Sequence, residues 1–379
     1  MRGRIIGTVI LLSITIGGNF YIARSLYQGL ILVLPHLNMA VYIGIYAFIA
    51  LAFYVRLLPV FYGIKHVMNW IGLHWLGVFT YLLSLFLIAD IVILLGRVTR
   101  LIPSPAPPDV RVWSVSIVVL LTAALILYGK YNAALIRHVY YDIKLKESTL
   151  PEEIKIVMIA DLHFGYIAAE KSLPKIVKGI NALEPDIVCI VGDIFNDDIN
   201  FIRNPNVAID LFKSVKTKYG VYACLGNHDS GETFPEMMNF LEQSNIKVLK
   251  DEYVVIDDRI TLVGRLDKHS IGGFEGLERT DTADVLESID SKLPIVVMDH
   301  NPSYVEEYGN NVDLILSGHT HRGQFIPITL ITKSMYDVDY GHYQKDPDSP
   351  HVIITSGAST WGTPIRIGTN NEIVSIALR

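Results

Sequence analysis

Four long apolar runs occupy the first third of the chain and predict membrane-spanning helices. Each is close to the length of about 20 residues that a helix needs to cross the hydrocarbon core of a bilayer. The runs cover residues 5–23, 40–60, 72–95 and 112–128. The first run alone would also fit a signal peptide, but three further runs favour an integral membrane segment. We therefore predict a membrane domain over residues 1–129 with four transmembrane helices, and a multi-pass protein of the cell membrane.

Short connections with helix breakers and polar residues separate these runs. They are expected at residues 35–38, 62–70 and 103–108, outside the hydrocarbon core, where water can satisfy free backbone groups. Basic residues near the membrane tend to stay on the cytoplasmic side. Arg2 and Arg4 favour a cytoplasmic N-terminus, and the basic residues of 130–146 favour a cytoplasmic second half, whereas Arg97, Arg100 and Arg111 count against this orientation. We expect the second half in the cytoplasm, with the extracellular side as the alternative.

After a basic linker at residues 130–150, the pattern changes to short β-branched runs that alternate with amphipathic segments of helical length. This alternation is typical of βαβ units and a buried sheet. The strand-like runs Ile154–Ala160, Ile187–Val191 and Val221–Leu225 are each followed by a helix-like segment, at Lys171–Ala182, Val207–Lys216 and Phe234–Gln243 respectively. We predict one α/β domain over residues 151–379, a length that is ample for one core.

The middle of this second half carries three strand-like runs with only short turns between them. They lie at residues 248–249, 253–256 and 260–263, and predict a local antiparallel patch. Four further runs, at residues 295–298, 314–316, 352–355 and 373–378, complete the expected set of strands.

Charge is distributed unevenly along the chain. Residues 1–150 contain twelve Lys and Arg and four Asp and Glu, so their net charge is +8. Because the whole chain has a net charge of −6, residues 151–379 carry −14. An acidic second half argues against nucleic acid as a partner, because a phosphate backbone attracts a basic surface. It is compatible with a site that holds cations. Cys189 and Cys224 lie inside apolar runs and are expected to pack in the core.

Side chains that can bind metal ions follow five of the predicted strands. Ligands of open α/β sheets gather beyond the carboxyl ends of strands, where loops from different strands converge. In chain order these loops read Asp161-Leu162-His163, Gly192-Asp193, Gly226-Asn227-His228-Asp229, Asp299-His300 and Gly318-His319-Thr320-His321. Each motif alone is an ordinary polar turn, but five of them in order, each at a strand end, indicate one metal site. Imidazole, carboxylate and amide ligands without cysteine suit Mn²⁺, Fe²⁺ or Zn²⁺ and argue against a structural zinc site.

This ordered set of motifs resembles the calcineurin-like metallophosphoesterases, and the Gly-His-Thr-His-Arg-Gly-Gln sequence at residues 318–324 with the preceding membrane segment is similar to their bacterial membrane-bound branch. Relatives in that branch include phosphodiesterases and hydrolases of a UDP-linked diacylglucosamine. The resemblance implies an αββα sandwich of two mixed sheets flanked by helices. It also implies two divalent metal ions: one held by Asp161, His163 and His321, the other by Asn227, His300 and His319, with Asp193 bridging both.

The same resemblance implies catalytic roles, and the chain departs from the family pattern at one position. His228 would stabilise the transferring phosphoryl group or protonate the leaving oxygen, and Asp229 is expected to orient it. Arg322 and Arg366 are candidates for binding phosphate oxygens, with solvent-facing arginines as the alternative. The family often has Gly-Asp-x-x-Asp, whereas this chain has Asn196 at the last position and aspartates only at 197 and 198. That position generally lies outside the metal ligands, so we expect a change in loop structure or substrate contacts.

The leading hypothesis is a membrane-anchored, metal-dependent phosphohydrolase that cleaves a phosphodiester or pyrophosphate with a metal-activated hydroxide. A membrane anchor favours a lipid-linked phosphoester as substrate and the lipid bilayer as partner. Two alternatives stay open: a membrane sensor or transport subunit whose phosphoesterase-like domain does not turn over substrate, and a phosphodiesterase of soluble nucleotides.

Overall fold

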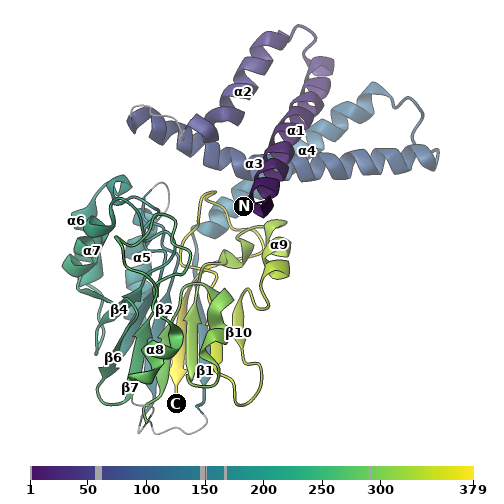
Figure 1. Ribbon diagram of the computed structural model, residues 1–379. Helices are drawn as coiled ribbons and strands as arrows, with labels where there is room; N and C mark the ends of the chain where they lie inside the picture. Colours follow the sequence, from purple (N-terminus) through teal and green to yellow (C-terminus); the bar gives the residue numbers. More distant parts are fainter. Residues whose placement is uncertain (1, 56–61, 146–149, 151, 166–168, 290–291) are drawn as a thin grey trace. The chain divides into compact units, whose positions relative to one another are not determined.

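Two compact units make up the protein in a computed structural model that describes residues 2–55, 62–145, 150, 152–165, 169–289 and 292–379. The first unit ends at Gly129 and the second runs from Lys130 to Arg379 (Figure 1). The first predicted domain also ends at residue 129, whereas the predicted α/β domain begins only at residue 151, after a linker.

Four helices lie over the four apolar runs in the described part of the first unit. They are α1 (Arg2–Val33), α2 (Met39–Val55), α3 (Tyr62–Val98) and α4 (Pro108–Ala133). Residues 62–70, predicted as a connection, belong to α3 instead, and residues 56–60 of the second predicted run lie outside the described residues. Within the described residues, Gly63–Val98 and Pro108–Ala133 are long and apolar enough to cross a membrane, whereas Met39–Val55 is shorter. Spanning by all four runs stays a prediction.

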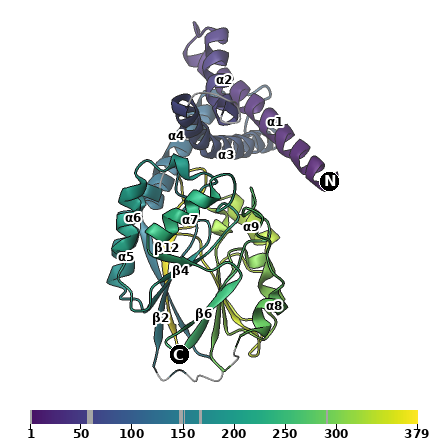
Figure 2. The ribbon, with the colours of Figure 1, turned by 60° about the vertical axis from the view of Figure 1, so that its left-hand side comes forward.

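The second unit is a sandwich of two six-stranded mixed sheets with helices on both outer faces, which confirms the predicted fold class (Figures 1 and 2). The first sheet has the order β1-β12-β2-β3-β4-β5 and the second β10-β11-β9-β8-β7-β6. The strands of the first sheet are β1 (Ile136–Ile143), β12 (Asn371–Leu378), β2 (Ile154–Ile159), β3 (Ile187–Val191), β4 (Val221–Cys224) and β5 (Ile246–Val248). The strands of the second sheet are β10 (Gly341–Tyr343), β11 (His351–Ile354), β9 (Leu314–Ser317), β8 (Ile295–Met298), β7 (Ile260–Gly264) and β6 (Glu252–Ile256).

Alternation of side chains along the strands builds a three-layered core. In β2, Val157 and Ile159 face a cluster shared with α5 (Ala169–Ala182), α6 (Pro205–Lys213) and α7 (Phe234–Gln243), whereas Ile156 and Met158 pack between the two sheets. A third apolar cluster joins the outer face of the second sheet to α8 (Thr282–Glu287) and to the 3-10 helix η2 (Pro302–Tyr308). Short elements η1 (Ile199–Phe201), η3 (His321–Gly323) and α9 (Ile328–Met335) complete the unit.

Two expectations from the sequence differ from the structure. The predicted linker at residues 130–150 contains β1, which pairs in parallel with β12 over eight residues and buries Ile143 between the sheets. The predicted antiparallel patch of three strands is wrong for its first member: β6 and β7 are antiparallel, but β5 pairs in parallel with β4 in the other sheet. Both differences arise because strand pairing depends on partners far away in the chain, which local patterns do not encode.

Candidate metal centre

The five predicted loops converge where the carboxyl ends of both sheets meet. Loops after β2, β3 and β4 come from the first sheet, and loops after β8 and β9 from the second, so both sheets contribute to one site. The backbone there is unusual: the left-handed region is occupied by Asp161 (φ 56°), His163 (φ 49°), Asp193 (φ 51°), His319 (φ 70°) and His321 (φ 48°). Each such residue costs roughly 1 kcal/mol, and clusters of them mark functional sites. The surrounding packing therefore holds these side chains in fixed directions.

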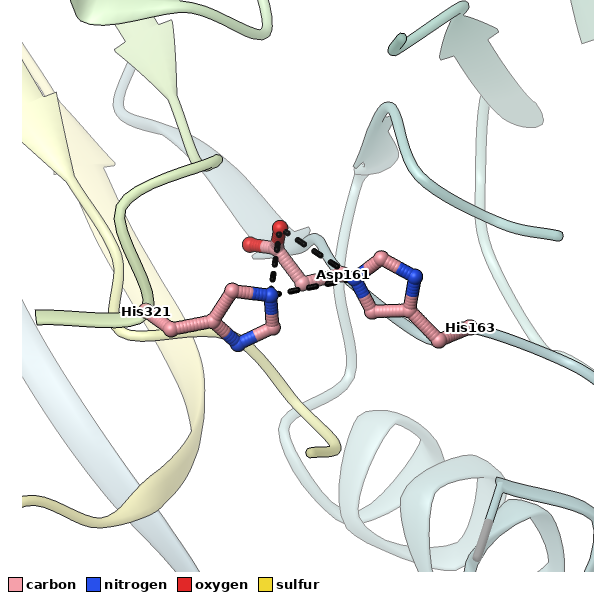
Figure 3. Close-up of side chains that lie close together, drawn as sticks. All are labelled: Asp161, His163 and His321. Atoms are coloured by element: carbon pink, nitrogen blue, oxygen red, sulfur yellow. Dashed lines mark hydrogen bonds and ion pairs between the residues drawn. The ribbon is translucent and has the colours of Figure 1, made fainter. Parts of the chain in front are cut away.

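Asp161, His163 and His321 form the first group of converging ligand atoms (Figure 3). His163 Nε2 lies 3.0 Å from His321 Nε2, and His321 Nε2 lies 3.3 Å from Asp161 Oδ1. All three side chains are buried. Burial lowers the pKa of His163 to about 3 and holds the pKa of His321 well below its usual range, so both imidazoles are neutral and present lone pairs.

A second group lies beside the first and shares Asp193 with it. Asp193 Oδ2 is 3.1 Å from His300 Nε2 and 3.7 Å from His163 Nε2, so the carboxylate stands between the two groups. His319 belongs to the second group, and its Nδ1 lies 2.9 Å from Asn227 Oδ1. Burial lowers the pKa of His319 to about 4. The structure thus brings all seven predicted ligands together.

The contacts of His300 are those expected of a metal-binding histidine. Its Nδ1 lies 2.8 Å from the carbonyl oxygen of Val191, which can only accept, so Nδ1 carries a proton. In the neutral ring, Nε2 is then a lone pair that faces a carboxylate oxygen of Asp193, and this buried nitrogen has no hydrogen-bond partner of good geometry among the described residues. Two acceptors at this distance need a positive charge between them, either a proton or a metal ion. A backbone carbonyl behind the ring is also the usual support for a metal-binding histidine.

Burial and charge act against each other at Asp193 and His300. Loss of solvation by itself would raise the pKa of Asp193, but a positive charge on the adjacent His300 holds it well below the usual range, and Asp193 in turn raises the pKa of His300. Burial raises the pKa of Asp161 to about 7. This carboxyl group therefore needs a nearby cation to stay ionised at neutral pH.

Glycines let the loops approach each other closely. A Cβ on Gly226 would lie 2.2 Å from Asp193 Oδ1, and a Cβ on Gly192 (φ 71°) would lie 2.6 Å from His300 Nδ1. Any side chain at these positions would displace a ligand of the site.

His228 faces the groups as a histidine that is not among the seven ligands. Its Nδ1 lies 2.6 Å from Asp197 Oδ1, and its backbone N donates to Asp193 Oδ1 at 2.9 Å. Burial alone would lower the pKa of His228, but the hydrogen bond to Asp197 and the charges of Asp193, Asp197 and Asp229 together outweigh it and raise the pKa. His228 is therefore well placed to donate a proton from Nε2.

The expected partner of His228 was wrong. Asp229 is fully buried, and its two carboxylate oxygens accept from the backbone N of Phe195 at 2.8 Å and of Gly226 at 2.9 Å. It connects the loops after β3 and β4, whereas Asp197 orients the imidazole. The signal in the sequence was the displaced aspartate: Asp197 stands one position beyond the Gly-Asp-x-x-Asp pattern.

The two predicted phosphate-binding arginines lie in different surroundings. Arg322 is partly exposed, and its guanidinium stands 4.4 Å from the centre of the Tyr340 ring. Arg366 is 0% exposed and donates to the backbone oxygens of His321 (2.9 Å), Ser356 (2.6 Å) and Ser359 (2.6 Å). An arginine so enclosed supports the ligand loops from behind and does not reach solvent.

Comparisons with known proteins agree with this arrangement. Residues 154–323 match the family model of calcineurin-like phosphoesterases. The chain is 27% identical over 274 residues to an uncharacterised metallophosphoesterase of Campylobacter jejuni, covering 71% of this chain and 70% of the relative. It is 30% identical over 276 residues to a transmembrane protein with a metallophosphoesterase domain from Danio rerio, covering 69% and 61% respectively. The chain thus spans between 61% and 70% of the length of these two relatives.

Proposed function

The α/β unit belongs to the calcineurin-like metallophosphoesterase superfamily of phosphoric ester hydrolases, and from that premise we propose that this chain is a membrane-anchored enzyme that hydrolyses a phosphodiester or pyrophosphate. The observation that carries the proposal is the convergence of the ligand groups around Asp193, whose Oδ2 lies 3.1 Å from His300 Nε2 and 3.7 Å from His163 Nε2. Such a site is suited to two divalent cations. The proposed metals are Mn²⁺, Fe²⁺ or Zn²⁺, as imidazole, carboxylate and amide ligands favour.

Each ligand has a proposed place. Asp161, His163 and His321 would hold one ion, and Asn227, His300 and His319 would hold the other, with Asp193 shared. When bound, two divalent ions supply an activated water and stabilise oxygen charge during phosphoryl transfer. The chain keeps the imidazoles neutral by burial and fixes their direction through the left-handed backbone.

His228 is the proposed general acid. Nδ1 of His228 donates a hydrogen bond to Asp197. Its other ring nitrogen, Nε2, can then protonate the leaving oxygen and stabilise negative charge on the phosphoryl group. The raised pKa of His228 keeps the ring protonated to higher pH than an unperturbed histidine. Asp197 is half exposed, which places the pair at the rim of the site, where a substrate can enter.

The membrane part of the proposal rests on the first unit. Two of its helices are long and apolar enough to cross a bilayer, and the Danio rerio relative is described as a transmembrane protein. We propose a multi-pass anchor with the α/β unit in the cytoplasm, and a lipid-linked phosphoester as the substrate, because an anchored enzyme meets membrane substrates at high local concentration.

Hydrolysis of bis-p-nitrophenyl phosphate by the full chain, purified in nanodiscs and loaded with Mn²⁺, tests this function. Turnover should require added metal, and Asp193→Asn or His228→Ala should reduce kcat on the order of 100-fold or more while thermal unfolding changes little. A metal-replete protein without turnover on a broad panel of phosphodiesters, pyrophosphates and monoesters would contradict the enzyme and support a binding role.

A further inference from the structure

α9 (Ile328–Met335) is an apolar helix without a buried residue. Leu330 is 67% exposed, Ile331 50% and Met335 69%. Successive residues advance by about 100° around a helix, so these three side chains share one face of roughly 140°. Helices this short gain their stability from packing an apolar face, and a group of exposed large apolar side chains marks a contact surface. The face of α9 therefore lacks the partner that its composition predicts.

This helix is coupled to the metal centre at both ends. It begins shortly after η3, which contains His321, and a Cβ on Gly323 would lie 2.6 Å from the backbone of Thr329. Directly after the helix, Tyr336 packs edge-on against His319 with ring centres 6.4 Å apart. Whatever covers α9 will therefore lie beside the metal ligands.

Trp361 lies beside His228 and is bonded to the segment that precedes α9. Its side chain is 51% exposed, and its ring centre is 6.0 Å from that of His228. Gln324, four residues before α9, accepts from the backbone N of Trp361 at 2.8 Å and donates to its backbone O at 3.0 Å. Half-exposed tryptophan is typical of membrane interfaces, where the ring is apolar at one end and can donate a hydrogen bond at the other.

The end of the candidate membrane span α4 is bonded next to this surface. Asn132 Nδ2 donates to the backbone oxygens of Arg366 (3.1 Å) and Thr369 (2.8 Å). The same loop reaches the segment before α9, because Ile326 N donates to Ile367 O at 3.1 Å. The last residues of α4, which belong to the second unit, are therefore bonded to the loop that borders α9. α9 itself carries one lysine and no acidic residue, so anionic lipid headgroups would not repel it.

We propose that the α9 surface, defined by Leu330, Ile331, Met335 and Trp361, contacts the lipid bilayer and holds the metal centre at the membrane interface. The inference rests on the proposed membrane anchoring and deepens the proposed function. A metal centre at the interface is within reach of phosphoesters in lipid headgroups, whereas a soluble nucleotide needs no such surface.

Site-directed spin labelling of the full chain in nanodiscs of phosphatidylcholine and phosphatidylglycerol tests the surface directly. Cys189 and Cys224 are both buried, so a label attached at Leu330→Cys or Met335→Cys reports on that position. Val207→Cys on α6 is the matched control, because Val207 is also an exposed apolar residue on a helix of the same unit. Collision rates with oxygen, which enters lipid, and with a water-soluble nickel chelate are measured on metal-free protein.

The ratio of oxygen to nickel collisions at 330 and 335 should exceed that at 207 by at least about threefold, as expected for side chains in a lipid interface. Nickel collisions as frequent as at 207 would place α9 in water and overturn the proposal. Shielding from both reagents would also overturn it, since a second copy or another protein would then cover the helix. Turnover of bis-p-nitrophenyl phosphate on a parallel aliquot with Mn²⁺ reports the metal centre separately, so a failed hydrolase and a failed lipid contact are distinguishable.

Discussion

At the scale of single residues, the site depends on two aspartates, Asp197 and Asp229, that differ in function. Asp197 accepts a hydrogen bond from Nδ1 of His228. Asp229 accepts hydrogen bonds from two backbone N–H groups in the interior. Asp229 directly follows His228 in the chain, whereas Asp197 is 31 positions away, and only their hydrogen bonds show that Asp197 orients the imidazole.

Replacing Asp197 with Asn should reduce kcat on the order of 10- to 100-fold, because the neutral amide lacks the negative charge that raises the pKa of His228 and can also turn an N–H₂ group toward the ring. Metal content, measured by elemental analysis, and the thermal midpoint should stay nearly unchanged, since Asp197 is half exposed and partly exposed ion pairs contribute little to stability.

Asp229→Asn is the matched comparison and should behave oppositely. An amide in place of the buried carboxylate turns an N–H₂ group toward a backbone donor and leaves that donor unsatisfied, at a cost of about 1–3 kcal/mol. Thermal unfolding should reveal this loss. Equal stability of the two variants would contradict the assignment of their roles.

Arg366 is predicted to act through its neighbours. Arg366→Met removes the donor to three backbone oxygens and to Asn371 Oδ1 at 2.7 Å, and should lower the free energy of unfolding by about 3–5 kcal/mol, as breaking a buried charged network does. Weaker metal binding, measured by calorimetry, should accompany it, because His321 loses its backbone support.

The control Arg322→Met removes a partly exposed contact with Tyr340 worth about 0.5–1 kcal/mol, and should leave metal binding unchanged. A Km increase with Arg322→Met alone would support its predicted contact with phosphate.

At the scale of elements, β1 is part of the sandwich although it precedes the first predicted strand. It covers the edge of β12 along eight residues, and Ile143 is only 1% exposed. An uncovered edge strand of this length favours aggregation.

A soluble fragment of residues 130–379 should therefore be more stable than one of residues 150–379. The shorter fragment loses the burial of Ile143 and Leu145, which amounts to about 3 kcal/mol or more, and exposes the β12 edge. Urea unfolding and size-exclusion chromatography would compare the two. If the shorter fragment were equally stable and monomeric, β1 would be dispensable for the fold.

At the scale of the whole molecule, the first unit has its own polar cluster. Arg111 Nη1 lies 3.2 Å from Asp90 Oδ1, and Tyr21 donates to Asp90 Oδ2 at 2.6 Å, so one carboxylate connects α1, α3 and α4. A charged group among apolar helices is normally paired in this way.

Orientation is the prediction that belongs to this scale. In sealed vesicles, a membrane-impermeant maleimide should label Val207→Cys when the cytoplasmic face is outside and should fail to do so in the opposite orientation, because the basic residues at 130–146 favour the cytoplasm. Cys189 and Cys224 are buried, so the unsubstituted chain supplies the background. Labelling only in the opposite orientation would place the α/β unit on the extracellular side.

The sequence alone predicted the fold class and the family, and it located the residues that converge at the candidate metal centre. Asp161, His163 and the other members stand at strand ends, and a strand and the residue after it are adjacent in the chain, so local periodicity is enough to locate them. The apolar first third was recognisable for the same reason, since length and hydropathy are local properties.

Only the tertiary structure decided which partners those residues have. Asp197 and His228 are 31 positions apart, whereas Asp229 is adjacent to His228 and still turns away from it. Arg366 and Arg322 cannot be distinguished by residue type, yet Arg366 is enclosed by carbonyl oxygens and Arg322 lies over a tyrosine ring. The physical reason is that hydrogen bonds and burial depend on how loops from different strands meet, and strand pairing over long separations sets that geometry.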